Sequence, residues 1–176
     1  MNISVRQMKL HEIPFVVDYF LDADQEFLKG MGADKNKLPK REKWIGLFEK
    51  KFEIPVAKKK FFDLIWLLND IPVGHSNINN ISYGKQATMH LHLWQSKNRK
   101  QGLGSAFVKL SIPIYFETFQ LDKLICEPYA GNPAPNQVLK KVGFNFIKSY
   151  ETTPGWINFH QKVCKYEFTK EMLGSL

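Results

Sequence analysis

The sequence predicts an α/β (α+β) fold in one domain spanning residues 1–176: a mixed, mostly antiparallel sheet of six or seven strands flanked by helices. Three observations predict this. Apolar stretches of strand length recur along the chain, with three in direct succession in its middle. Helical patterns alternate with strand patterns in both halves. A chain of 176 residues, 44% of them hydrophobic, can also bury one core of its own.

The first sixty residues are expected to form a strand, a helix, a loop and a second helix. Residues 2–8 have the pattern of an opening strand, and residues 12–28 that of one long helix with Pro14 in its first turn. Glycines and a proline make residues 29–39 a loop, and residues 41–53 form the next helix. The apolar residues expected on the two helix faces are Phe15, Tyr19, Phe20, Trp44, Leu47, Phe48 and Phe52.

The middle of the chain predicts three adjacent strands joined by hairpins. The nearly continuous apolar run "FFDLIWLL" (61–68) predicts a central strand buried on both faces. The stretches "VGHSNINNI" and "ATMHLHLW" supply the next two. A helix then presents Leu103, Phe107, Leu110 and Ile114 on one face, and Pro113 is expected to kink or end it.

The last third predicts a strand, a helix and two closing strands. "DKLICEPY" is the strand, "NPAPNQVLKKVGF" is a short helix ended by Gly143, and "FNFIKSY" and "KVCKYEF" close the sheet.

The formal net charge of +8 suits a polyanionic ligand, such as a phosphorylated cofactor, a nucleic acid or an acidic lipid surface. The lysine run 58–60 has no stacking aromatic motif beside it, which favours a solvated strand entrance over a nucleic-acid patch. No membrane-length apolar tract or signal-type block is present, so we expect a cytoplasmic protein with neither nucleic acid nor membrane as partner. Cys126 and Cys164 lack metal-binding spacing, so we expect two reduced, buried thiols and no metal.

The stretch "RKQGLGS" (99–105) joins a strand to a helix. Gly102 and Gly104 allow the backbone to approach a ligand closely, and the helix start presents unpaired N–H groups and a positive dipole end. Together with Arg99 and Lys100 they could bind an anion the size of a pyrophosphate. A tight turn without any ligand would have the same sequence, so both readings stay open at this point.

Two motifs resemble those of the GNAT superfamily of N-acetyltransferases. "RKQGLG" is similar to the signature R/Q-x-x-G-x-G/A, which in that family lies between the fourth strand and the third helix. "NPAPNQVLKKVGF" is similar to N-x-x-S/A-x-x-x-L/Y-x-K-x-G-F, with matches at Asn132, Leu139, Lys141, Gly143 and Phe144. The resemblance implies a sheet splayed between its fourth and fifth strands, and acetyl-CoA as co-substrate. The CoA-binding residues it implies are Leu93, Trp94, Arg99, Lys100, Gln101, Gly102, Leu103, Gly104, Ser105 and Asn132.

A narrower pattern, D/E-P-x-x-x-N at Glu127, Pro128 and Asn132, resembles the aminoglycoside 6'-N-acetyltransferases and the siderophore lysine N-acyltransferases. In those enzymes the acidic residue lies in the acceptor site. The siderophore branch also links catalysis to a histidine about nine residues before the signature arginine, which is the spacing of His90 to Arg99.

The catalytic residues we expect are His90, Glu127 and His92. An amine must lose a proton before it attacks a thioester, and histidines or perturbed carboxylates are suitable bases. Strand alternation places both histidines on one face, where a purely structural role is the alternative. For Glu127 the alternative is an ordinary salt bridge to a lysine.

The general acids and the base that relatives use are missing from their usual positions. Leu139 and Pro135 stand where relatives carry a tyrosine or serine acid, and Thr88 and Met89 stand where others carry a glutamate base. We therefore expect His90 to accept the proton and to shape the ascending limb of the pH profile near neutrality.

The expected activity is transfer of an acetyl group from acetyl-CoA to a primary amine of a small molecule, directly and within a ternary complex, by a monomer or homodimer. Three alternatives remain open: a CoA-binding or ligand-sensing module without turnover, an acetyltransferase of protein amino termini, and a metal site formed by His75, His90 and His92.

Overall fold

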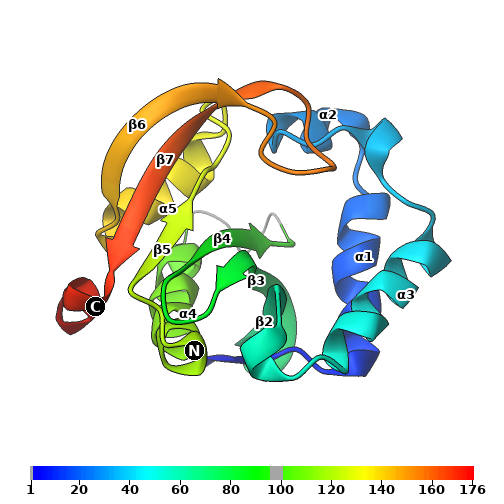
Figure 1. Cartoon of the computed structure of the whole chain (residues 1–176). Helices are drawn as coiled ribbons and strands as arrows, with labels where there is room; N and C mark the ends of the chain where they lie inside the picture. Colours follow the sequence, from blue (N-terminus) through cyan, green and yellow to red (C-terminus); the bar gives the residue numbers. More distant parts are fainter. Residues whose placement is uncertain (1, 96–100) are drawn as a thin grey trace.

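A computed structural model describes residues 2–95 and 101–176, and its centre is a seven-stranded sheet in the order β1-β2-β3-β4-β5-β7-β6 (Figure 1). The strands are β1 (Ile3–Gln7), β2 (Phe61–Leu68), β3 (Ile71–Ser82), β4 (Gln86–Leu93), β5 (Lys123–Cys126), β6 (Asn145–Thr152) and β7 (Gln161–Thr169). The helices are α1 (Ile13–Leu21), α2 (Gln25–Gly30), α3 (Arg41–Phe52), α4 (Leu103–Phe119) and α5 (Pro133–Val142). None of the described helices is long and apolar enough to cross a bilayer.

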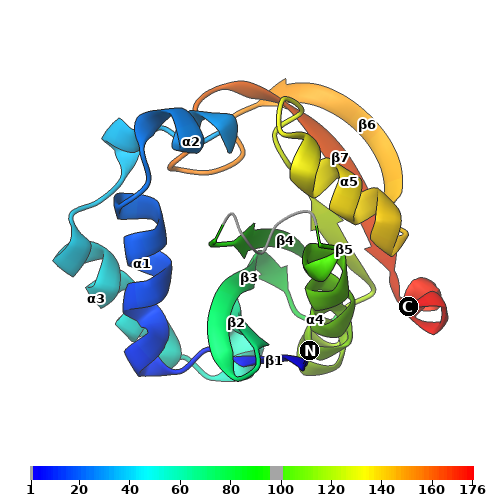
Figure 2. The same cartoon turned by 180° about the vertical axis from the view of Figure 1, so that it is seen from behind.

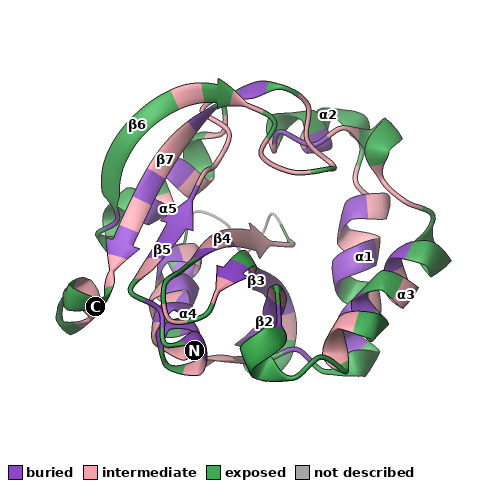
Figure 3. Ribbon diagram, viewed as in Figure 1, coloured by how far each residue is buried: buried purple, intermediate pink, exposed green. Residues whose placement is uncertain are grey.

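The two faces of the sheet bury two separate cores. In β2, Leu64 and Trp66 belong to the core under α4 and α5, whereas Ile65 and Leu67 belong to the core under α1 and α3. Residues along the middle of β2 and of β3 are buried, and buried residues are drawn in purple in Figure 3. The prediction of a central strand buried on both faces is confirmed. Because neither face of β2 meets water, its sequence is nearly continuously apolar and does not alternate with polar residues.

The sheet parts between β4 and β5. These two strands run parallel and pair only at Gln86, Ala87 and Thr88 with Lys123, Leu124 and Ile125. Beyond that register β4 continues along β3 as far as Leu93, while β5 turns toward β7. The predicted mixed sheet with a splay between its fourth and fifth strands is confirmed.

The helix expected over residues 12–28 is two helices. α1 ends at Leu21, and Asp24 starts α2 by accepting a hydrogen bond from the backbone N–H of Phe27 at 2.7 Å. An aspartate at this position satisfies an otherwise unpaired donor, which favours a new helix start. The expected faces also shift, since Phe15 and Leu47 are exposed.

Helix α4 continues past Pro113 to Phe119, so the expected early end is wrong. Its buried face also differs from the expected one: Leu110 is 42% exposed, and Ser111 is fully buried. The Ser111 hydroxyl accepts from Trp66 Nε1 at 3.0 Å and donates to the carbonyl of Phe107 at 2.8 Å. The hydrophobic pattern missed the true buried face because this face includes a hydrogen-bonded serine. The helix continues past Pro113 because its packing in the core outweighs the backbone hydrogen bond lost at the proline.

The connection between β6 and β7 is bound to the segment after α2, and Figures 1 and 2 show the two side by side from both directions. We call this contact the clasp. The Gly32 carbonyl accepts from Asn158 Nδ2 at 2.8 Å and from Gln161 Nε2 at 2.7 Å. The backbone N–H of Asp34 donates to the Ile157 carbonyl at 2.8 Å. The amino-terminal helices therefore meet the carboxyl-terminal hairpin on one side of the molecule.

Candidate active site

Beyond Thr88 and Ile125 the strands β4 and β5 separate, and we call the gap between them the parting. Some backbone groups of β4 point into this gap. The N–H of Trp94 donates to the Val73 carbonyl at 3.0 Å, so Trp94 bonds toward β3. Antiparallel pairing alternates, and the N–H and C=O groups of Leu91 and Leu93 therefore point to the parting. Of the two residues expected to bind CoA through their backbones here, Leu93 has the required direction. The Trp94 N–H is used within the sheet.

Side chains of β4 alternate as expected. Met89, Leu91 and Leu93 pack against the core under α4, and His90, His92 and Trp94 project to the face of α1. His92 stacks on His75 with ring centroids 4.7 Å apart and 18° between the planes.

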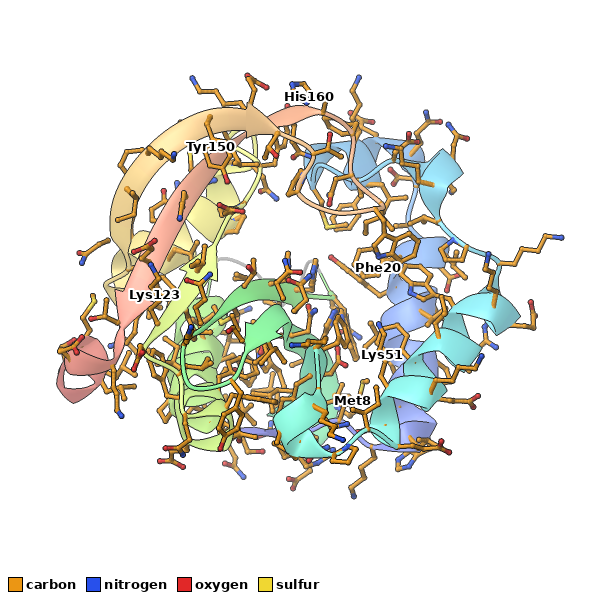
Figure 4. All side chains as sticks on the ribbon, in the orientation of Figure 1. Met8, Phe20, Lys51, Lys123, Tyr150 and His160 are labelled. Atoms are coloured by element: carbon orange, nitrogen blue, oxygen red, sulfur yellow. The ribbon has the colours of Figure 1, made fainter. Side chains whose placement is uncertain are left out.

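His92 lies inside an aromatic cluster. Its ring is 5.6 Å from that of Tyr19 and 5.2 Å from that of Phe20, the residue labelled at the core of this face in Figure 4. Burial lowers the pKa of His92 to about 3, so its imidazole is neutral at pH 7. These contacts give His92 a packing role, and its expected part in catalysis stays a prediction.

His90 and Glu127 occupy corresponding positions on the two sides of the parting. His90 lies two residues beyond Thr88, and Glu127 lies two residues beyond Ile125, with which Thr88 forms the last pair of the parallel register. The Nε2 atom of His90 is buried and has no hydrogen-bond partner within residues 2–95 and 101–176. Burial lowers the pKa of His90 to about 4, so its titration lies well below the expected near-neutral range.

The Glu127 carboxylate has a partner that the sequence did not suggest. The Tyr150 hydroxyl donates to Glu127 Oε1 at 2.5 Å, and this hydrogen bond raises the pKa of Tyr150 to about 12. Among the described residues Glu127 has no salt bridge to a lysine, and its carboxylate is not isolated. Tyr150 lies on β6, where the alternating pattern of "FNFIKSY" predicted a strand and gave no signal for a site. A neutral phenol is thus held beside a carboxylate at the parting.

The glycine turn has the geometry of an anion site. Gly102 precedes α4 with φ +77°, a left-handed conformation that side chains disfavour, and as the N-cap residue it has no side chain to cap the helix. A Cβ atom on Gly104 would lie 3.4 Å from Val138 Cγ2 of α5, so this glycine allows the two helices to approach. Of the other expected ligands, Gln101 is exposed and Ser105 is buried. Arg99 and Lys100 lie outside the described residues.

Lys141 adds a cation at this turn. Its Nζ lies 3.8 Å from the position of a Cβ on Gly102, although the two residues are far apart in sequence. Lys141 is one of the matches in the second motif, which was the only sequence signal for it. An ammonium beside the N–H groups of a helix start fits a pyrophosphate.

Asn132 and Asn136 have different structural tasks. Asn132 caps α5, its Oδ1 accepting from the Ala134 N–H at 3.3 Å. Asn136 is buried, donates to the carbonyls of Asn132 and Tyr129, and accepts from the Tyr166 hydroxyl at 3.0 Å. Replacing Asn136 would therefore disturb the fold, whereas Asn132 is half-buried at the start of α5 and its Nδ2 group has no part in that cap.

No group of three histidine, cysteine, aspartate or glutamate side chains is placed to hold a metal ion in the part of the chain that the structure describes. Cys126 is buried and Cys164 is half-buried, and both are free thiols. Burial raises the pKa of the Cys126 thiol, which keeps it protonated.

The family model described as an acetyltransferase (GNAT) domain matches residues 3–145. The chain belongs to the GNAT acetyltransferase family. A search of curated protein sequences gives no significant match. Solved structures with the same GNAT fold are similar along nearly their whole length.

Aminoglycoside acetyltransferase AAC(6')-Ib in complex with coenzyme A has a TM-score of 0.73 and 13% identity, and the match covers 99% of this chain and 98% of that one. The ribosomal L7/L12 alpha-N-protein acetyltransferase RimL, also in complex with coenzyme A, has a TM-score of 0.78 and 13% identity over 96% and 94% of the two chains. Spermidine N-acetyltransferase from Vibrio cholerae, in complex with CoA and spermine, has a TM-score of 0.78 and 12% identity, with 96% of both chains covered.

On the α1 face of this GNAT domain a cleft of 740 Å³ begins beside the end of β4. Its walls come from α1, from the segment that leads into α2, from the start of β3 and from Trp94. Within residues 2–95 and 101–176, the charged side chains that line it are three aspartates, Asp18, Asp22 and Asp24. The parting between β4 and β5 thus has the glycine turn near one side and an acidic cleft near the other.

Proposed function

We propose that this acetyltransferase moves an acetyl group from acetyl-CoA directly to a primary amine of a small molecule within a ternary complex. The observation that carries the proposal is the placement of His90 and Glu127 at corresponding positions across the parted strands. The glycine turn with Lys141 offers a site for the pyrophosphate, and the edge of β4 offers backbone groups to an extended amide chain.

The proposed chemistry requires an uncharged nucleophile. The ammonium of the acceptor approaches Glu127, whose charge holds it, and gives up one proton to His90 directly or through water. The nitrogen then forms a bond to the acetyl carbon, the carbon–sulfur bond breaks, and the sulfur leaves as a thiolate, which takes up a proton. His90 is neutral at pH 7 and its Nε2 has no other partner among the described residues, so it can accept.

Solved relatives in the fold family support a small amine as acceptor. The aminoglycoside acetyltransferase has been crystallised with kanamycin, and the Vibrio cholerae enzyme with spermine. The likeness to RimL keeps protein amino termini as a second acceptor class to be tested.

Release of the CoA thiol in the presence of an amine panel tests the proposal. The panel contains polyamines, aminoglycosides, hydroxylysine and a peptide with a free amino terminus. We expect turnover with at least one small amine, and a decrease in kcat of about a hundred- to ten-thousand-fold for His90→Ala with unchanged CoA affinity. The matched control is His160→Ala, because His160 is exposed in the connection between β6 and β7 (Figure 4).

Two outcomes would contradict the proposal. CoA binding without thiol release for any amine would identify a non-catalytic CoA-binding module. A folded His90→Ala protein with near-normal turnover would assign the base role to Glu127 or to solvent.

A further inference from the structure

The 740 Å³ cleft has a charge opposite to that of the protein as a whole. The chain carries a net charge of +8, but among the described residues the charged side chains that line the cleft are all carboxylates. Asp18 is paired with Arg41 of α3 at 2.7 Å, and Asp24 caps α2. The carboxylate of Asp22 is exposed and has no hydrogen-bond or ion-pair partner within the described ranges. One full negative charge is therefore available to a ligand in this cleft.

The apolar walls of the cleft are mostly aromatic. Phe15, Tyr19, Phe27 and Trp94 line it, together with Ile71 and Pro72. Aromatic faces attract organic cations and also pack against methylene chains, which an anionic or purely polar ligand would not exploit. Walls of this kind beside a carboxylate suit an aliphatic cation.

One of these walls is held in place by a buried histidine. Trp94 Nε1 donates to His75 Nδ1 at 2.8 Å, and the His75 ring is only 2% exposed and stacked on His92. Because Nδ1 accepts, the proton of the neutral imidazole sits on Nε2, and the tautomer is fixed. Phe15 contacts the indole from another side, with ring centroids 6.0 Å apart. The indole is therefore oriented before any ligand arrives.

The cleft also lies where a non-reacting part of the acceptor would extend. Trp94 directly follows Leu93, whose backbone groups point to the parting, and His90 projects to the same face of β4 as Trp94. A molecule with one amine at His90 and Glu127 would reach the cleft along the side chains of β4.

We propose, on the basis of the function proposed above, that Asp22 and the Trp94 indole select acceptors that carry a second positive charge on an aliphatic chain, and that His75 is the positioning residue of that indole. The second cation lies against Asp22 and the aromatic walls, and the reacting amine lies at the parting. A monoamine of equal length has no second cation to pair with the Asp22 carboxylate. An amino acid of that length places its own carboxylate beside Asp22, where the two negative charges repel.

The test compares 1,5-diaminopentane, pentylamine and 5-aminopentanoate as acceptors. We expect kcat/KM to be about tenfold or more higher for the diamine than for pentylamine, the ratio that corresponds to a cation–aromatic contact and one charge contact. Asp22→Asn should remove most of this preference by raising KM for the diamine. Asp122→Asn makes the same change of charge at an exposed site before β5 and should retain the preference.

His75 is tested by a pair of variants. His75→Asn keeps a hydrogen-bond acceptor near the indole N–H and should retain the preference for the diamine, whereas His75→Leu should raise KM for the diamine with little change in kcat. Equal loss in both variants, or no loss in either, would overturn the positioning role. Melting temperatures of both identify any variant that fails to fold, in which case Trp94→Leu and Trp94→Phe repeat the comparison.

Failure of this inference differs from failure of the proposed function. Equal kcat/KM for the diamine and pentylamine would overturn the inference and leave the acetyltransferase intact. If no amine is acetylated, calorimetric titration of 1,5-diaminopentane into the CoA-loaded protein decides: binding that Asp22→Asn weakens supports the cleft assignment, and the absence of binding overturns it.

Discussion

Two alanine substitutions in the glycine turn should change the stability of the ligand-free protein in opposite directions. Gly102 has φ +77°, and a side chain in the left-handed region costs about 1–2 kcal/mol, partly offset by a stiffer unfolded chain. Gly104 lies inside α4, where alanine is favoured over glycine by about 1 kcal/mol, and its new methyl group would meet Val138 Cγ2 at an ordinary contact distance of 3.4 Å. Gly102→Ala should therefore destabilise by about 1 kcal/mol, and Gly104→Ala should stabilise by about 0.5 kcal/mol.

Both substitutions should weaken CoA binding, since each adds a methyl group where the backbone must approach an anion. In the natural chain, CoA at about a hundred times its Kd should stabilise the fold by roughly 2.7 kcal/mol. A tenfold weaker Kd at the same concentration lowers this gain to about 1.4 kcal/mol. Urea unfolding with and without CoA measures both quantities.

Two other glycines provide matched controls. Gly84 has φ +71° in the turn between β3 and β4, and Gly46 lies inside α3, and neither would bring a Cβ atom within 4 Å of a neighbour. Without ligand, Gly84→Ala should destabilise the protein as Gly102→Ala does, and Gly46→Ala should stabilise it as Gly104→Ala does. Both control variants should keep the full stabilisation by CoA. Full CoA-dependent stabilisation in both turn variants would refute the assignment of the anion site.

Lys141→Ala should weaken CoA binding several-fold, because its Nζ lies beside Gly102, whereas Lys140→Ala, an exposed neighbour on the same helix, should not; equal effects in calorimetric titration would remove Lys141 from the site. The protein should lose stability as the pH falls from about 6.5 toward 4. Burial lowers the pKa values of His75 and His92 in the folded state, so the unfolded chain binds protons that the folded chain cannot, and stability present above the unfolded pKa is lost on acidification. His92→Gln should flatten the decline of melting temperature between pH 7 and pH 5, and an unchanged slope would show that this imidazole does not contribute.

Local patterns identified most of the elements and the glycine turn, which we propose as the pyrophosphate site. The run 61–68 and the glycine turn could be recognised because continuous apolarity and closely spaced glycines have direct conformational causes. Helix faces were less certain wherever a polar residue is buried and satisfied, as Ser111 is in α4. A hydrophobic pattern cannot include such a residue, because one of its hydrogen-bond partners, Trp66, lies on a strand far away in the sequence.

The acceptor side could not be assembled from the sequence. Tyr150 meets Glu127 only because β6 folds back along β7, and the bond between His75 and Trp94 exists only because β3 pairs with β4 in one register. None of these residues lies in a sequence pattern that would indicate its partner. The pKa of His90 was likewise expected near neutrality from its ordinary value, and burial in the folded chain moves it to about 4.

Because the clasp joins the segment after α2 to the connection before β7, a substitution in one of these segments changes which substitutions the other tolerates. A Cβ atom at position 32 would lie 2.1 Å from Gln161 Oε1, so any side chain there must displace the Gln161 amide, which donates to the Gly32 carbonyl. Substitutions at these sites should therefore combine non-additively. No described residue of the glycine turn or of α5 takes part in that contact. Substitutions in the clasp can thus accumulate in coupled pairs while the proposed cofactor site stays unchanged.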